Sequence, residues 1–88
     1  MFNQYMNSIK QKSYEELEWA HEILVPFALK CKHSVFGNLT PEESMKRLAE
    51  IENTMLPVNC RIWGCKTYGD ASRMNKAIVR QMDLLDED

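Results

Sequence analysis

The residues best suited to chemistry lie between Pro57 and Arg80, where basic and aromatic side chains are interleaved. Residues 57–82 carry five basic residues against one acidic residue, a net charge of +4 within a chain of net charge -2. Guanidinium groups pair with phosphate through two hydrogen bonds, and aromatic rings stack on bases. One hypothesis is therefore that this segment binds nucleic acid or a phosphate-bearing nucleotide ligand. Its candidate residues are Arg61, Trp63, Lys66, Tyr68, Arg73, Lys76 and Arg80.

The same charges also have a purely structural explanation, which we favour. Arg73, Lys76 and Arg80 recur three and four residues apart, so they line one face of a helix. A helix that faces a core needs a charged outer face whether or not it binds a ligand. The segment 83–88 carries four acidic residues and can fold over this face.

A zinc site is the next possibility, because three cysteines and a histidine could supply four ligands. Structural zinc sites usually take paired ligands from a knuckle with two to four intervening residues. Cys31 and His33 lie two residues apart and would point about 200° apart on a helix. Cys60 and Cys65 do not have the spacing of a redox pair either. We expect no metal site and no cofactor.

Catalysis is not indicated. His21 lies among the apolar positions of a helix, where a histidine is more often hydrogen-bonded in the core or at a subunit contact than catalytic. The sequence contains no known nucleophile motif, no glycine-rich phosphate loop and no acidic metal loop. We expect a protein that is not an enzyme.

Methionine and aromatic residues are abundant, with six Met, two Trp and three Tyr in 88 residues. Such side chains are favoured where a surface adapts to a protein partner. An equally good explanation is that they close the core of a small bundle. The candidate protein-contact residues are Phe2, Tyr5, Met6, Trp19 and Ile23.

One long helix, expected over residues 14–36, must position most of these groups. Ser13 and Glu16 form a capping box at its start, and Gly37 supplies a stop signal after Phe36. Pro26 removes a backbone hydrogen bond, so we expect a kink or a break near Val25. The inward stripe recurs at helical spacing. It consists of Tyr14, Leu17, His21, Leu24, Ala28, Cys31 and Val35, widened by Ala20 and Phe27.

Three further helices are expected around the long one. A short amphipathic helix covers residues 2–11. Thr40, Pro41 and Glu43 begin a helix over 41–55, and Asp70 caps a helix over 71–84, after which the acidic residues of the tail fray. Residues 57–69 read as a short helix or irregular connector, although a strand also fits. The inward positions are Met45, Leu48, Ile51 and Met55 in the third helix, and Ala71, Met74, Ile78, Met82 and Leu85 in the last.

These elements predict an all-α fold, a small irregular four-helix bundle with a Pro-kinked long second helix. Residues 1–88 form a single helical domain whose segment 83–88 is a frayed acidic tail. The absence of a signal peptide and the odd number of cysteines favour a reducing cytoplasm, and no apolar run is long enough to span a membrane. We expect a small non-enzymatic cytoplasmic protein, of a kind frequent among phage and mobile-element regulators, that modulates or inhibits a larger protein partner and forms a homo-oligomer. The alternative is the binder of nucleic acid or a nucleotide described above.

Overall fold

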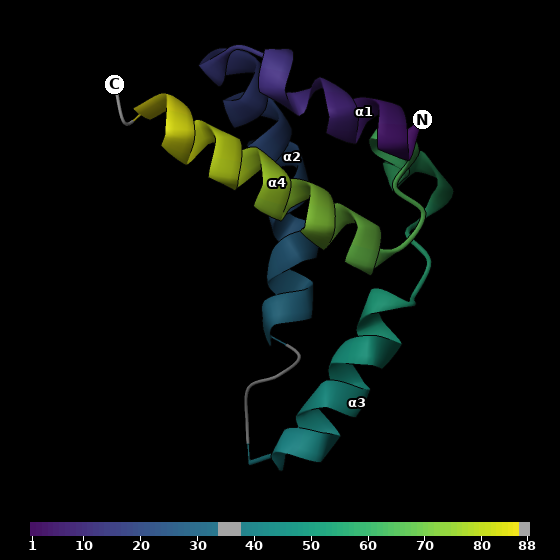
Figure 1. Cartoon of the computed structure of the whole chain (residues 1–88). Coiled ribbons are helices and arrows are strands. Elements are labelled where there is room, and N and C mark those ends of the chain that lie inside the picture. The colour runs from purple at the N-terminus through teal and green to yellow at the C-terminus, as the bar shows by residue number, and fades with distance from the viewer. Residues whose placement is uncertain (34–37, 87–88) are drawn as a thin grey trace.

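The computed structural model describes residues 1–33 and 38–86, apart from the side chain of His33. Over these residues the fold is all-α, as predicted, with four α-helices and short 3-10 turns (Figure 1). The expected roles of Val35, Phe36, Gly37 and the last two acidic residues lie outside the described residues. The elements in chain order are α1 (Phe2–Ser8), η1 (Ile9–Gln11), α2 (Tyr14–His33), α3 (Pro41–Glu52), η2 (Val58–Cys60), η3 (Ile62–Gly64) and α4 (Tyr68–Asp86).

The long second helix begins where its capping residues predicted. The hydroxyl of Ser13 accepts a hydrogen bond from the backbone N–H of Glu16 at 3.3 Å. The helix then runs through Pro26 without interruption, so the structure has no break near Val25. A kink at this proline stays a prediction.

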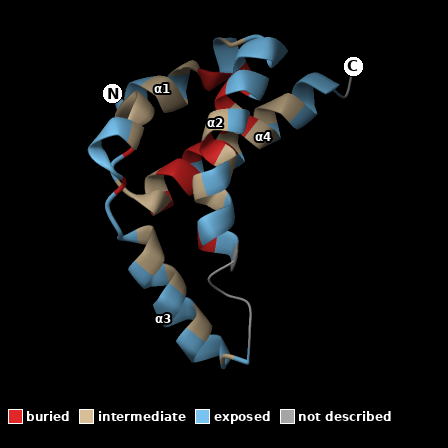
Figure 2. Cartoon of the chain, turned by 180° about the vertical axis from the view of Figure 1, so that it is seen from behind, coloured by how far each residue is buried: buried red, intermediate tan, exposed pale blue. Residues whose placement is uncertain are grey.

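The core forms where α2 and α4 cross. The two helices cross with opposite chain directions, since His21 of α2 meets Asn75 of α4 and Phe27 meets Tyr68, and buried segments of both lie at the crossing in Figure 2. Leu17, Leu24 and Cys31 are buried, as predicted, whereas Tyr14 is 37% exposed and was wrongly placed in the core. Ala20 of α2 and Ile9 of η1 are also buried. Further buried apolar residues come from α4 and from the connector that precedes it, residues 56–67. They are Leu56, Cys65, Ala71, Met74 and Ile78.

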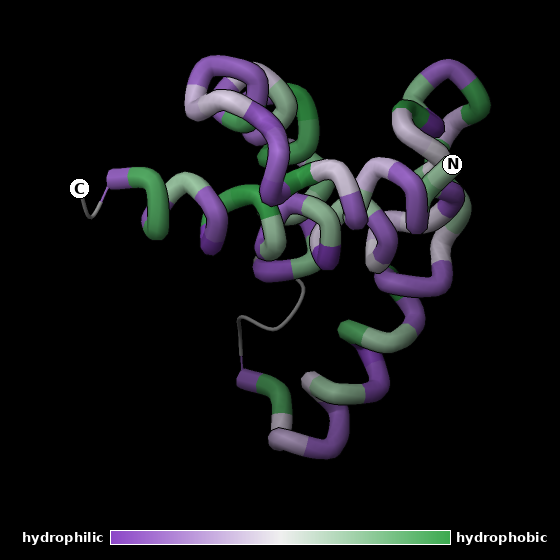
Figure 3. The backbone as a smooth tube through the Cα atoms, turned by 45° about the horizontal axis from the view of Figure 1, so that its top comes forward, coloured by the Kyte–Doolittle hydropathy of each residue, from purple (hydrophilic) through white to green (hydrophobic). Residues whose placement is uncertain are grey.

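The third helix departs most from expectation. Thr40 caps it as predicted, since its hydroxyl accepts from the N–H of Glu43 at 3.2 Å. However, α3 contains no buried residue. Of its predicted inward stripe, Leu48 and Ile51 are half-buried, Met45 is 73% exposed, and Met55 lies beyond the helix and is 51% exposed. The helix diverges from the other three (Figure 1), and its apolar and polar residues alternate along it (Figure 3).

The end of α3 was also predicted three residues too late. The hydroxyl of Thr54 donates to the carbonyl of Glu50 at 2.9 Å, and the chain then becomes extended ahead of Pro57. Met55 forms an isolated antiparallel bridge with Thr67. Within the described ranges this bridge is not extended into a strand, and residues 57–67 form two 3-10 turns, consistent with the short helix or irregular connector that we favoured.

The last helix begins at Tyr68, three residues before its predicted start. Thr67 is the capping residue, because its hydroxyl accepts from the N–H of Asp70 at 3.2 Å. Asp70 was predicted to occupy this position but lies within the first turn of the helix. At the other end, α4 continues through Asp86, so the fraying expected from about residue 85 is not seen at Leu85 and Asp86.

Candidate functional site

Three aromatic rings from three different elements meet on one side of the molecule. Tyr5 of α1 stacks on Trp63 of η3 with their ring centroids 4.7 Å apart. Trp19 of α2 meets Trp63 edge-on at 5.8 Å. Trp19 is 61% exposed, whereas Tyr5 and Trp63 are half-buried and pack against the core. We call these three residues the aromatic patch.

An unusual backbone turn holds Trp63 in the patch. Trp63 has φ 56° and Gly64 has φ 83°, so both lie in the left-handed region. This conformation costs a residue other than glycine roughly 1–2 kcal/mol, which the surrounding contacts must offset. A Cβ atom added to Gly64 would lie 2.5 Å from the backbone nitrogen of Phe2, so the turn sits directly against the start of α1.

The predicted protein-contact residues fall around this patch. Phe2, Tyr5 and Met6 are half-buried and pack against the core, which supports the structural explanation for them. Trp19 stays exposed, and Ile23 follows it one helical turn later. From the sequence we predicted Tyr5 and Trp19 as protein-contact residues. We placed Trp63, whose ring contacts both of them, among the candidate phosphate ligands.

The basic residues of α4 form an exposed row, as their spacing predicted. The guanidinium of Arg73 is engaged by the carboxylate of Asp70 at 2.6 Å. Lys76 and Arg80 border a shallow hollow that also includes Asp83. Acidic side chains therefore accompany the row at both ends, which weakens its attraction for phosphate.

The other candidate phosphate ligands are distributed over separate parts of the surface. Trp63 belongs to the aromatic patch. Tyr68 packs against Phe27 with ring centroids 5.9 Å apart and lies beneath the ammonium group of Lys30. Arg61 donates from Nε to the carbonyl of Leu56 at 3.0 Å. Lys66 borders a hollow beside the first residues of the chain. Whether any of these residues binds phosphate stays a prediction.

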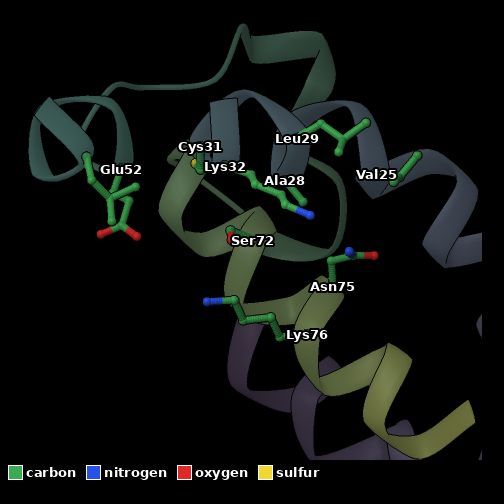
Figure 4. A pocket seen from close by; sticks show the side chains of 10 residues that line it. Val25, Ala28, Leu29, Cys31, Lys32, Glu52, Ser72, Asn75 and Lys76 are labelled. Atoms are coloured by element: carbon green, nitrogen blue, oxygen red, sulfur yellow. The ribbon is translucent and has the colours of Figure 1, made fainter. Parts of the chain in front are cut away.

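A groove bordered by α2, α3 and α4 has no counterpart in the predicted sites. Its volume is about 350 Å³, and Figure 4 shows the side chains that line it. Its apolar lining includes Val25 and Leu29 of α2 and Leu48 of α3, and Leu29 is 40% exposed. The sequence signal was the amphipathic pattern of α3, which we interpreted as a core stripe.

The charged residues of the groove are mainly basic. Lys32 of α2 and Lys76 of α4 border it and are exposed, and Glu52 of α3 is the acidic residue in its lining. The buried thiol of Cys31 also belongs to the lining. Burial raises the pKa of Cys31, and the carboxylate of Glu52 raises it further, while nearby cations that include Lys76 and Lys30 act to lower it.

His21 has the structural role that we favoured. Its Nδ1 lies 2.7 Å from Oδ1 of Asn75, so the imidazole donates to the amide oxygen and joins α2 to α4. Asn75 is only 8% exposed. A buried acceptor without its donor is destabilising by about 1–3 kcal/mol, so this hydrogen bond contributes to the fixed packing of the two helices.

Cys60 and Cys65 are free thiols, and within residues 1–33 and 38–86 no three potential ligands gather as a metal site requires. Cys65 donates to the sulfur of Met74 in the core at 3.7 Å, and Cys60 donates to the side chain of the adjacent Asn59. In the part of the chain that the structure describes, no helix has the length and apolar character to cross a membrane. Comparison of the chain with protein-family models, curated proteins and solved structures found no match.

Proposed function

We propose that this chain is a non-enzymatic binding protein that attaches to a larger protein partner through the aromatic patch and thereby modulates it. The observation that carries the proposal is the exposure of Trp19, 61%, on a helix that buries the nearby Leu17 and Ala20. Tryptophan and tyrosine are the residues most enriched among those that dominate the free energy of protein association. An exposed tryptophan supported by two further rings is therefore a suitable anchor.

The arrangement of the patch lowers the entropic cost of binding. The ring of Trp63 stacks on Tyr5 and contacts Trp19 edge-on. The turn at Trp63 and Gly64 lies directly against the backbone of Phe2. Side chains that are already ordered before association lose less conformational freedom on binding. The cation of Lys12 lies 4.9 Å from the centre of the Tyr5 ring and adds a polar rim.

Affinity capture with two matched variants tests this function. The immobilised chain is exposed to a native lysate of its source cells at low and high salt, beside Trp19→Ala and the control Val58→Ala. Val58 is 79% exposed and lies in η2, outside the patch. Both variants remove an exposed apolar side chain, so circular dichroism and thermal unfolding should match the wild type.

We expect one protein to be retained by the wild type and by Val58→Ala at both salt concentrations. Trp19→Ala should weaken its retention at least tenfold, because truncation of an anchor costs about 2 kcal/mol or more. Equal retention by Trp19→Ala overturns the proposal. Retention of nucleic acid that disappears at high salt and in an Arg73→Glu, Arg80→Glu variant also overturns it, in favour of the phosphate-binding alternative.

A further inference from the structure

We propose that the groove between α2, α3 and α4 binds the C-terminal turn of α4 from a second copy of the chain. The groove and the aromatic patch share no lining residue, so this inference does not depend on the proposed function. It specifies which surfaces would form the homo-oligomer expected from the sequence.

The groove is an apolar surface that the fold leaves uncovered. Its walls carry Val25 and Leu29 from α2 and Leu48 from α3, and α3 contributes no buried residue to the core. A helix with an amphipathic pattern usually buries its apolar face. Filling the groove would complete the burial that α3 lacks within one chain.

The end of α4 has the complementary composition. Leu84 is 54% exposed and Leu85 is 39% exposed, and the exposed carboxylates of Asp83 and Asp86 flank them. Two adjacent leucines on the last turn of a helix are suited to entering a short apolar groove. Like the lining of the groove, they expose apolar surface that association would remove from water.

Charge selects this occupant over a neutral one. Lys32 and Lys76 border the groove and form no ion pair with any described residue, while Glu52 is the acidic residue of the lining. The lining of the groove therefore has two cations against one anion, although Asp83 of the same chain shares the neighbouring hollow with Lys76. The four residues of the incoming turn include two anions. Opposite charges at the rim of a contact fix its register and favour the matching partner.

The turn cannot reach the groove of its own chain. The carboxylate of Asp86 lies close enough to Tyr14 to raise the pKa of that phenol, which places the end of α4 beside the first residue of α2. The groove borders α2 at Val25, Leu29 and Lys32. At 1.5 Å per residue, Tyr14 and Leu29 are separated by about 22 Å along the helix. The occupant must come from another molecule.

The contact would occur twice in a two-fold dimer, because each copy has one groove and one terminal turn. Mutual exchange of the two is the self-complementary arrangement that two-fold symmetry requires. Doubling a small contact brings the buried area toward that of a stable interface, about 800 Å² per partner.

Charge reversal in two variants tests the inference. The groove variant carries Lys32→Glu and Lys76→Glu. The tail variant changes the four acidic residues of 83–88, Asp83, Asp86, Glu87 and Asp88, to lysine. Association is measured by sedimentation velocity over a range of concentrations, with Val58→Ala and Trp19→Ala as controls. Circular dichroism checks the fold of each variant, and all described positions that are changed are exposed.

We expect the wild type and both controls to form a dimer of twice the 10.3 kDa chain mass. Each charge variant alone should dissociate at concentrations at least tenfold higher than the wild type does, because its groove and tail then carry the same sign. An equimolar mixture of the two variants should recover the dimer, since each groove again meets a tail of opposite charge. Wild-type dimerisation should also weaken at high salt.

Three results would overturn the inference. A wild-type chain that stays monomeric at millimolar concentration means that the groove is covered by another protein or by nothing. Variants that associate as well as the wild type exclude these two surfaces. A mixture that fails to recover the dimer, although both variants are folded, shows that the variants act other than by pairing the groove with the tail.

Discussion

At the scale of the residue, the carboxylate of Asp70 makes several polar contacts at the start of α4. Its carboxylate accepts from the backbone N–H of Lys66 at 3.0 Å and of Thr67 at 3.3 Å, and it pairs with the guanidinium of Arg73. Partial burial acts to raise the pKa of Asp70, but these hydrogen bonds outweigh it and the pKa is lowered. The ionised carboxylate therefore stabilises the start of α4.

We predict that Asp70→Asn lowers the free energy of unfolding by about 1 kcal/mol at pH 7, the usual contribution of a capping interaction. Because the folded-state pKa is below the unfolded value of about 3.9, the contribution is complete above that value. It is lost as the pH falls through the folded-state pKa. Urea unfolding of the wild type and the variant at pH 7 and near pH 2 measures this difference.

Glu50→Gln is the control, since Glu50 lies exposed on α3 and should matter little at either pH. A difference in the free energy of unfolding between wild type and Asp70→Asn that stays constant down to pH 2 would contradict the assigned role of the charge.

The sequence indicated that Asp70 belongs to a helix start, because aspartate favours that position. It did not show that Thr67 would be the cap, since a threonine and an aspartate three residues apart both suit the role.

At the scale of the element, the helices differ in how far local pattern determined their packing. The apolar stripes of α2 and α4 predicted buried residues correctly at Leu17, Leu24, Met74 and Ile78. The equally regular stripe of α3 did not predict burial. Periodicity shows that a helix has an apolar face, but only the arrangement of the other elements decides whether a surface is available to cover it. The groove and the aromatic patch depend on three elements each, so neither followed from local pattern.

The weak docking of α3 predicts that it opens independently of the core. Thr40→Ala removes the hydrogen bond to the N–H of Glu43, and Ser13→Ala removes the equivalent bond to Glu16 in α2. Each cap contributes about 1 kcal/mol, a factor of about five in an opening equilibrium. We expect Thr40→Ala to accelerate amide hydrogen exchange about fivefold throughout α3. Ser13→Ala should affect only the first turn of α2, because Leu17 and Ala20 are buried just beyond it.

Hydrogen exchange followed by mass spectrometry or nuclear magnetic resonance distinguishes these outcomes. The melting temperature should change less for Thr40→Ala than for a core substitution, since α3 buries no residue. If Thr40→Ala instead accelerates exchange in α2 and α4 to the same extent as in α3, the third helix unfolds with the core. The dimer inferred above provides an internal check, because filling the groove should slow exchange in α3 as the protein concentration rises.

At the scale of the whole molecule, the connector from Leu56 to Thr67 contacts both the α2–α4 core and α1. It places Leu56 and Cys65 among the buried residues of α2 and α4, and it places Trp63 against α1. Its backbone is fixed by the hydrogen bond from the N–H of Leu56 to the carbonyl of Lys66 at 2.8 Å. The connector therefore cannot open without disturbing the contact between α2 and α4, and the molecule should unfold as one cooperative unit apart from α3.

The rate at which the thiol of Cys65 is alkylated should measure this cooperativity. Its exposed fraction is 0%, and burial together with the carboxylate of Asp70 raises its pKa to about 11. Since the thiolate is the reactive form, a buried thiol with this pKa is unreactive toward iodoacetamide near pH 8 until the protein opens. Cys60, which is half-buried in the 3-10 turn η2, should react much sooner.

Labelling at a series of urea concentrations, followed by peptide mass spectrometry, gives the opening free energy at each cysteine. For Cys65 it should equal the free energy of global unfolding and fall with urea at the same slope, because its enclosure requires α2, α4 and the connector together. A smaller value with a weaker urea dependence would show that the connector detaches by itself, and the turn that supports Trp63 would then not be rigid.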